Sequence, residues 1–215
     1  MSFEPFPKIG RLTRECVITE KIDGTNAQVN VVKAPYWPDD ATVPAIIARK
    51  DGFEGESLFM FAGSRTRYVT PEDDNYGFAA WVKANADELF TLGPGRHFGE
   101  WWGQKIQRVY GLTDKRFSLF NTTRWIDQHD PEAALDATEG RPTAQLAPAC
   151  CYVVPELYRG MFSDRVIDNM LAKLRAEGSV AAPGFMNPEG VVAFHTATGV
   201  LFKKTLEKDE QPKGK

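Results

Sequence analysis

The spacing of apolar residues constrains this chain most, because over most of its length it alternates as a strand does. Stretches with this two-residue period cover residues 15–21, 26–33, 45–50, 96–102, 116–122, 150–156, 189–195 and 199–206. Helical spacing is found over 77–90 and 164–177. Strands and helices do not alternate strictly, so the pattern predicts an α+β fold with largely antiparallel sheets.

Local signals predict where the second helix begins and ends, and where the chain turns between the last two strands. Ser163 is the expected N-cap of the second helix, and Gly178 is its expected C-terminal stop. The run Ala-Thr-Gly at 197–199 predicts a turn between the last two strands, which would make a C-terminal hairpin.

The chain of 215 residues is long enough for one domain, and we find no repeat, low-complexity block or linker that divides it. We therefore expect one domain over residues 1–206. The stretches 35–44 and 127–148 are expected to be excursions from that domain, and 207–215 a charged tail that frays.

Composition excludes several classes of protein. The 26 Lys and Arg residues against 29 Asp and Glu give a net charge of -3, so a nucleic acid could bind only at a local basic cleft. Cys16, Cys150 and Cys151 are too few and too badly placed for a disulfide framework. No apolar run approaches the roughly 20 residues that span a bilayer, and the N-terminus does not resemble a signal peptide. These features predict a reduced, cytoplasmic protein without a membrane partner.

The segment Glu-Lys-Ile-Asp-Gly-Thr-Asn at residues 20–26 is the most informative for chemistry. A predicted strand delivers Lys21 to its end, and Gly24 then turns the chain into the next strand. A lysine in such a place can act as a covalent nucleophile when neighbouring cations or loss of water favour its uncharged amine. The alternative is a surface lysine before a turn, and the short pattern does not decide between the two.

Further motifs follow this segment in order. They are Ser-Arg-Thr-Arg at 64–67, Phe-Gly-Glu-Trp-Trp-Gly at 98–103, Phe-Ser-Leu-Phe at 117–120, Pro-Glu-Gly-Val-Val at 188–192 and Val-Leu-Phe-Lys-Lys at 200–204. The series resembles the nucleotidyltransferase motifs of the covalent superfamily of ATP-dependent ligases and mRNA-capping enzymes, and most of all the RNA ligase 2-type branch. The resemblance spans about residues 8–204. It implies an α+β nucleotidyltransferase fold, an ATP-grasp-like ligase core in which mostly antiparallel sheets and a few helices flank an AMP-binding cleft.

The resemblance implies an ATP-dependent polynucleotide ligase that acts on RNA, with ATP and Mg²⁺ or Mn²⁺ as cofactors. Lys21 would attack the α-phosphate of ATP, release pyrophosphate and hold AMP through a phosphoramidate bond. The AMP would pass to a 5′-phosphate end, and a 3′-hydroxyl would displace it to seal the strand. Because each step is a phosphoryl transfer, the protein mainly has to position groups and neutralise charge.

The resemblance also implies roles for residues in the middle motifs. Arg65 corresponds to the phosphate-contacting arginine, and Arg67, expected on the same strand face, could assist it. Glu100 corresponds to a glutamate that contacts the ribose. Phe120 corresponds to the aromatic that stacks on adenine, whereas Phe117 is expected in the core.

In the last motifs, Glu189 corresponds to a carboxylate that contacts the divalent metal or the catalytic lysine. Lys203 is expected in the pocket, and Lys204, on the opposite strand face, is expected to be solvated. The family usually has a second lysine two residues after the first, where this chain has Thr205. The neighbours of the nucleophile complete the expected nucleotide-binding set: Glu20, Ile22 and Asn26.

Two features leave the substrate open. Asp23 stands where the RNA ligase 2 branch often has histidine, and aspartate is the choice of the wider superfamily, so this position does not decide between RNA and DNA. We expect no appended OB-fold or helical domain, and a partner protein could supply a nucleic-acid clamp to a monomeric core. The alternatives are a DNA-nick ligase, a guanylyltransferase and a module that binds nucleic acid without sealing it. For the ligase, the basic residues expected to converge in one cleft are Lys21, Arg65, Arg67 and Lys203.

Overall fold

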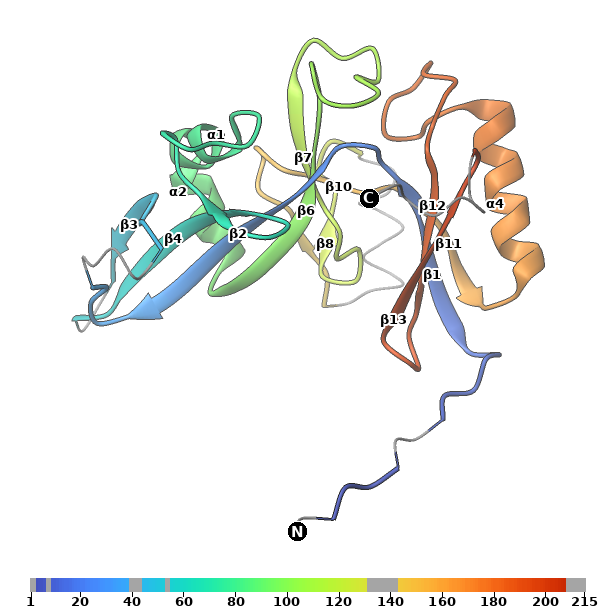
Figure 1. Cartoon of the computed structure of the whole chain (residues 1–215), viewed down its shortest axis with the longest axis horizontal. Coiled ribbons are helices and arrows are strands. Elements are labelled where there is room, and N and C mark those ends of the chain that lie inside the picture. Colours follow the sequence, from blue (N-terminus) through green and yellow to red (C-terminus); the bar gives the residue numbers. More distant parts are fainter. Residues whose placement is uncertain (1–2, 7–8, 39–43, 53–54, 131–142, 208–215) are drawn as a thin grey trace. The chain divides into compact units, whose positions relative to one another are not determined.

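The computed structural model describes residues 3–6, 9–38, 44–52, 55–130 and 143–207 (Figure 1). The chain divides into two compact units, the first made of residues 1–22 and 155–215 and the second of residues 23–154. Each unit has its own hydrophobic core. The single domain expected over 1–206 stays a prediction. The predicted tail lies outside the described residues from 208 onward, as do residues 39–43 and 131–142 of the two predicted excursions.

The first unit is a four-stranded antiparallel sheet with a helix on one face (Figure 1). In spatial order its strands are β11 (Glu156–Met161), β1 (Glu15–Lys21), β12 (Gly190–His195) and β13 (Val200–Thr205). The helix α4 (Asp164–Glu177) packs Leu171 and Leu174 against Ile18 and Ala193 of the sheet. This face therefore forms the apolar core of the first unit.

The predicted ends of α4 and the predicted hairpin are confirmed. The Ser163 hydroxyl accepts a hydrogen bond from the Val166 N–H at 3.3 Å, which satisfies one of the N–H groups that a helix start leaves without a partner. Gly178 follows the helix with φ of 85°, a left-handed value that suits glycine. The chain turns between β12 and β13, which pair antiparallel from Gly190↔Thr205 to His195↔Val200.

The second unit is built on a larger sheet. Its strand order is β10 (Tyr152–Val153), β7 (Lys115–Leu119), β6 (Gly95–Gly103), β2 (Thr25–Ala34), β4 (Ser57–Ser64) and β3 (Ala48–Asp51), and β5 (Tyr68–Val69) also pairs with β4. All of these pairs are antiparallel except β10 with β7. The short strands β8 (Trp125–Ile126) and β9 (Gln145–Leu146) form a separate parallel pair.

One face of this sheet is covered by α1 (Phe78–Ala84), α2 (Ala86–Leu89) and the 3₁₀ turn η2 (Phe90–Leu92). Aromatic rings pack closely there, with Phe78 5.5 Å from Trp101 and 5.1 Å from Phe117 between ring centroids. Because side chains alternate along a strand, the neighbours of these core residues point to the opposite face. That opposite face carries the polar motif residues.

The α+β class with mostly antiparallel sheets is confirmed, but several element boundaries were wrong. The helix expected over 77–90 is broken at Asn85 into α1, α2 and η2. The strand expected over 150–156 is only β10, since β11 begins at Glu156. The pattern also missed β4, whose residues 57–63 are nearly all buried on both faces, so that its sequence does not alternate. Among the described residues, no helix has the length and apolar character needed to cross a membrane.

Candidate functional site

Lys21 is the last residue of β1, and Glu189 comes directly before β12. The lysine Nζ lies 2.5 Å from Glu189 Oε2, and only 19% and 13% of the two side chains are exposed. The strand register explains the contact, because Lys21 pairs with Gly190 across β1 and β12. Gly190 has φ of 155°, and a Cβ there would collide with the Lys204 carbonyl oxygen, so the position next to Glu189 requires glycine.

Lys203 and Lys204 lie on opposite faces of the first unit's sheet, as predicted. The registers of β1, β12 and β13 place Lys203 on the same face as Lys21. Lys204 faces α4, where its Nζ is 2.7 Å from Asp168 Oδ1. The same register places Thr205 on the face that carries Lys203 and Lys21. Lys204 is therefore a partner of the helix rather than a purely solvated lysine.

Glu20 points to the face opposite Lys21 and is 1% exposed. Its carboxylate accepts hydrogen bonds from the Ser179 hydroxyl at 2.6 Å and from the next two backbone N–H groups at 2.8 and 3.0 Å. Burial raises the pKa of Glu20, and these three hydrogen bonds oppose the rise. Ile22 is also buried, with 3% of its surface exposed. A nucleotide contact from either residue would therefore come from its backbone.

The second unit begins at Asp23, whose carboxylate and backbone N–H both form hydrogen bonds. Its carboxylate Oδ2 accepts from Arg108 Nε at 3.0 Å, and its backbone N–H donates to the Tyr110 hydroxyl at 2.8 Å. The next backbone N–H, of Gly24, donates to Glu100 Oε1 at 3.1 Å. The turn after the candidate nucleophile is thus tied to β6 and to the segment that follows β6.

That segment, residues 104–111, has an unusual backbone. Lys105, Gln107, Val109 and Tyr110 have φ of 60°, 44°, 62° and 54°, a region that costs free energy for residues other than glycine. Ile106 and Tyr110 anchor the segment with 0% and 2% of their surfaces exposed. The sequence analysis did not assign Arg108 a role, and no local pattern links it to Asp23, which lies 85 residues earlier.

Three predicted nucleotide-binding residues share the polar face of the second unit's sheet. Asn26 on β2 pairs directly with Glu100 on β6. Phe120 follows the end of β7, where its N–H donates to the Phe98 carbonyl at 3.0 Å, and it is 39% exposed. Because Phe98 lies two residues before Glu100 on the same strand, all of these side chains point to one face. Phe117 is fully buried in the core, as predicted.

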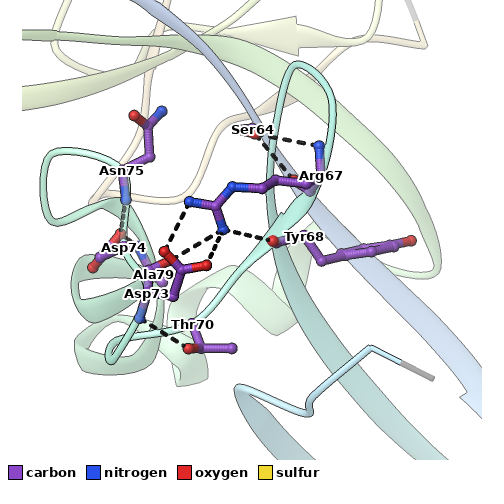
Figure 2. Close-up of polar contacts among 8 residues, drawn as sticks. All are labelled: Ser64, Arg67, Tyr68, Thr70, Asp73, Asp74, Asn75 and Ala79. Atoms are coloured by element: carbon purple, nitrogen blue, oxygen red, sulfur yellow. Dashed lines mark hydrogen bonds and ion pairs between the residues drawn. The ribbon is translucent and has the colours of Figure 1, made fainter. Parts of the chain in front are cut away.

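The expectation that Arg65 and Arg67 lie on one strand face was wrong. Both lie in the bend that joins β4 to β5, where the Ser64 N–H donates to the Arg67 carbonyl at 2.8 Å and closes a tight turn. Figure 2 shows the Arg67 guanidinium facing Asp73, with Nη1 2.6 Å from Oδ2 and Nη2 3.0 Å from Oδ1. Arg65 is exposed and makes no hydrogen bond or ion pair within the part of the chain that the structure describes.

The Arg67–Asp73 pair joins the bend before β5 to the loop between β5 and α1 (Figure 2). Asp73 N–H donates to the Thr70 hydroxyl at 3.2 Å. Asp74 accepts from the Asn75 and Ala79 N–H groups at 2.6 and 2.8 Å, the second of which is an N–H at the start of α1. The guanidinium fork of Arg67 is therefore engaged by the protein itself.

The family of the chain follows from comparison with known proteins. The family model described as RNA ligase matches residues 14–205, nearly the whole chain. This chain belongs to the RNA ligase family. No curated protein matches it.

Two solved structures of Naegleria gruberi RNA ligase mutants resemble this family member in fold. For one mutant without ligands, the sequence identity is 16% and the TM-score 0.50, and the match covers 89% of this chain and 49% of that chain. For another mutant, solved with ATP and Mn, the identity is 16% and the TM-score 0.50, with 93% and 52% covered. This RNA ligase family chain thus spans about half the length of those ligases.

Within this RNA ligase family chain, the predicted site residues fall into two groups, one in each unit. In the first unit, Lys21 contacts Glu189 and shares a sheet face with Lys203. In the second unit, Asn26, Glu100 and Phe120 share a sheet face, and Arg65 lies in a bend. The convergence of the basic residues in one cleft stays a prediction.

A divalent cation is compatible with the donors present in this RNA ligase family chain. Among the described residues, no group of three or more His, Cys, Asp or Glu could hold a metal by itself. Mg²⁺ commonly uses one or two carboxylates together with waters and substrate phosphates. Glu189 commits Oε2 to Lys21 and retains Oε1, so it fits as a single protein ligand of a cation that phosphates also hold.

Proposed function

We propose that this chain is the nucleotidyltransferase core of an ATP-dependent RNA ligase and that Lys21 is its covalent nucleophile. The half-buried Lys21–Glu189 pair carries the proposal, because it joins the lysine of the first motif to the carboxylate of the fifth at 2.5 Å. The two residues are 168 positions apart in sequence. Membership of the RNA ligase family, matched over residues 14–205, supports the reaction class.

In the first step, Lys21 Nζ forms a bond to the α-phosphorus of ATP, and the bond from that phosphorus to pyrophosphate breaks. The amine must first give up a proton, and Glu189 Oε2 lies within hydrogen-bond reach to accept it. Lys203, on the same sheet face as Lys21, supplies positive charge for the departing pyrophosphate. A bound divalent cation, for which Glu189 would be the ligand, would add further neutralisation of phosphate charge.

The residues of the second unit would bind the nucleoside. The exposed ring of Phe120 is suited to stacking on adenine, and the paired Asn26 and Glu100 offer hydrogen-bonding groups for the base and ribose. Arg65, which has no protein partner among the described residues, is suited to bidentate contact with a phosphate. The AMP would then pass to a 5′-phosphate end of RNA, and a 3′-hydroxyl would displace it.

Labelled ATP tests the proposal directly. Wild-type protein incubated with ATP and Mg²⁺ should form a covalent protein–AMP adduct that is acid-labile, as a phosphoramidate is. Lys21→Ala should form none, while Lys204→Ala, which removes a lysine that faces α4, should still form it. Absence of adduct in wild-type protein, tested both fresh and after pyrophosphate treatment to remove bound AMP, would refute the proposal.

A chase of the labelled adduct with nicked duplexes then identifies the polynucleotide. Transfer of label to a 5′-phosphorylated RNA nick, followed by sealing, is the expected result. Transfer to a DNA nick alone would replace the RNA ligase by a DNA-nick ligase, and binding without transfer would indicate a module that does not seal. Labelling by GTP rather than ATP would indicate a guanylyltransferase.

A further inference from the structure

We propose that Phe98 and Arg96 of β6 form a second nucleotide subsite, which binds one nucleotide of the substrate RNA beside the adenylate. The inference rests on the proposed ligase function for the identity of its ligand. Phe98 would stack on the base of that nucleotide, and Arg96 would contact its phosphate.

Strand register places both residues on the nucleotide-binding face. Phe98 pairs with Gln28 on β2, and on its other side it lies opposite Phe120, whose N–H it accepts at 3.0 Å. Arg96 and Glu100 lie two residues to either side of Phe98 on β6, so the three side chains form one row. The row runs directly beside Phe120, the ring assigned to adenine.

Exposure separates Phe98 and Phe120 from most aromatic rings of this face. Phe59, Phe61 and Trp102 also point to it, but each is at most 2% exposed. Tyr68 is 37% exposed on the same face, but its hydroxyl accepts a hydrogen bond from Asn30 Nδ2 and its ring packs against Phe61. Phe98 is 45% exposed and Phe120 39%. Residues directly opposite on antiparallel strands have Cβ atoms about 4.5–5.5 Å apart, so the two rings offer neighbouring stacking surfaces rather than one. Since Phe120 serves one base, Phe98 is left to serve another.

Arg96 supplies the charge that a nucleotide requires. It is exposed, and the described residues include no hydrogen-bond or ion-pair partner for it. It lies about 7 Å along the strand from Phe98, which suits a ligand with an aromatic base at one end and a phosphate at the other. An arginine fork binds phosphate oxygens in pairs, and stacking on an aromatic ring tolerates any base. The expected ligand is therefore a nucleotide of any sequence.

RNA binding tests the subsite in the full chain. The probe is a fluorescent 5′-phosphorylated oligoribonucleotide, and its dissociation constant is measured by anisotropy at several salt concentrations. Phe98→Leu, which keeps an apolar side chain but removes the ring, should weaken binding by roughly 5- to 150-fold, the worth of one base stack. Arg96→Gln should weaken binding and lower the slope of log affinity against log salt by about 1.

Two matched variants control for the loss of a ring or a charge in general. Phe202→Leu removes a ring that is 51% exposed on β13, and Arg175→Gln removes an exposed charge from the last turn of α4. Neither should change RNA affinity by more than about twofold. Equal losses in these controls and in the β6 variants would overturn the subsite.

A single abasic nucleotide moved along the probe locates the stacked base. In wild-type protein, one position near the 5′ end should lose affinity when its base is missing, and in Phe98→Leu the same change should cost nothing further. If the penalty persists in Phe98→Leu, or no position shows one, the proposed stack does not exist.

Measurement of lysyl-AMP formation on the same variants separates this proposal from the proposed function. RNA affinity should fall more than the rate of adduct formation does. If Phe98→Leu instead loses adduct formation while RNA affinity holds, the ring serves adenine and the second subsite is refuted. If wild-type protein forms no adduct, the ligase proposal fails, and the abasic series still decides whether Phe98 stacks on RNA.

Discussion

Replacement of Glu20 by alanine should destabilise the unit that carries Lys21. The Glu20 carboxylate is buried at the end of β1 and accepts three hydrogen bonds from residues 179–181. This segment follows α4 and leads toward Glu189, the partner of Lys21. Alanine would remove the acceptor of all three donors and leave a void beside the sheet.

The contacts set the size of the effect. Hydrogen bonds to a charged group contribute about 1.5–3 kcal/mol each when the donor is left buried. Ser179 is 4% exposed, so water could not replace the hydrogen bond that its hydroxyl would lose. Val180 is 45% exposed, so its N–H lies in a part of the loop that water can reach. Relief of the cost of burying a carboxylate offsets part of the loss. The net result is a loss of about 3 kcal/mol in the free energy of unfolding, or about 6–12 °C in Tm for a chain of this size.

Urea unfolding at pH 7 measures this loss, with Glu20→Gln and Glu15→Ala as comparisons. Glutamine keeps one oxygen for the two backbone N–H groups and presents its amide to the Ser179 hydroxyl, so it should cost less than about 1 kcal/mol. Glu15 is the exposed first residue of the same strand, and its truncation should be nearly neutral. A Glu20→Ala variant as stable as Glu15→Ala would refute the anchoring role.

The pH dependence gives an independent check with a definite sign. Burial raises the pKa of Glu20 above its ordinary value of 4.5, so the folded protein holds this proton to higher pH than the unfolded chain does. The extra stability that comes from this bound proton is complete below about pH 4.5 and is lost as pH rises through the folded pKa, while the hydrogen bonds that the carboxylate accepts remain. The free energy of unfolding of the wild type should therefore fall relative to that of Glu20→Gln as pH rises from 4.5.

Three shorter predictions concern neighbouring features. Lys203→Ala should slow lysyl-AMP formation by on the order of 100-fold, whereas Lys204→Ala, which breaks an exposed ion pair, should change only stability, by less than about 1 kcal/mol in urea unfolding. Ser118→Ala should cost about 1–3 kcal/mol in thermal unfolding, because a buried indole N–H loses an acceptor at 2.9 Å. Arg67→Lys should speed hydrogen exchange over residues 64–75, because lysine cannot make the two-pronged contact with Asp73.

Each of these has a contrary result that would count against it. Equal effects of the two lysine variants on adduct formation would contradict the role proposed for Lys203 in neutralising the pyrophosphate. A neutral serine variant would mean that the indole finds another acceptor. Unchanged exchange in the arginine variant would show that the bend does not depend on its ion pair.

Features encoded by neighbouring residues were predicted well. The helix over 164–177 was found as α4 with Ser163 as its cap, because both its apolar spacing and its cap lie within a few turns of chain. The opposite faces of Lys203 and Lys204 followed from strand alternation alone. The place of Phe117 in the core followed in the same way.

Features that depend on burial or turn geometry were not predictable in this way. β4 was not predicted because a strand that is buried on both faces has no polar residues to alternate with its apolar ones. Arg65 and Arg67 have the spacing of one strand face, but the hydrogen bond between the Ser64 N–H and the Arg67 carbonyl folds them into a bend. The pattern of residues is the same in both conformations, so the spacing could not decide between them.

The amino-acid order alone was sufficient for the class of fold, the order of the motifs and the choice of Lys21 as the candidate nucleophile. The family resemblance left open whether Glu189 contacts the metal or the catalytic lysine, and the folded chain places it 2.5 Å from Lys21. Only the folded chain revealed that Glu20 anchors residues 179–181 and that Arg108 holds Asp23. These contacts join residues 85 to 168 positions apart. Such contacts depend on how distant strands and loops pack against one another, which a local pattern of residues does not specify.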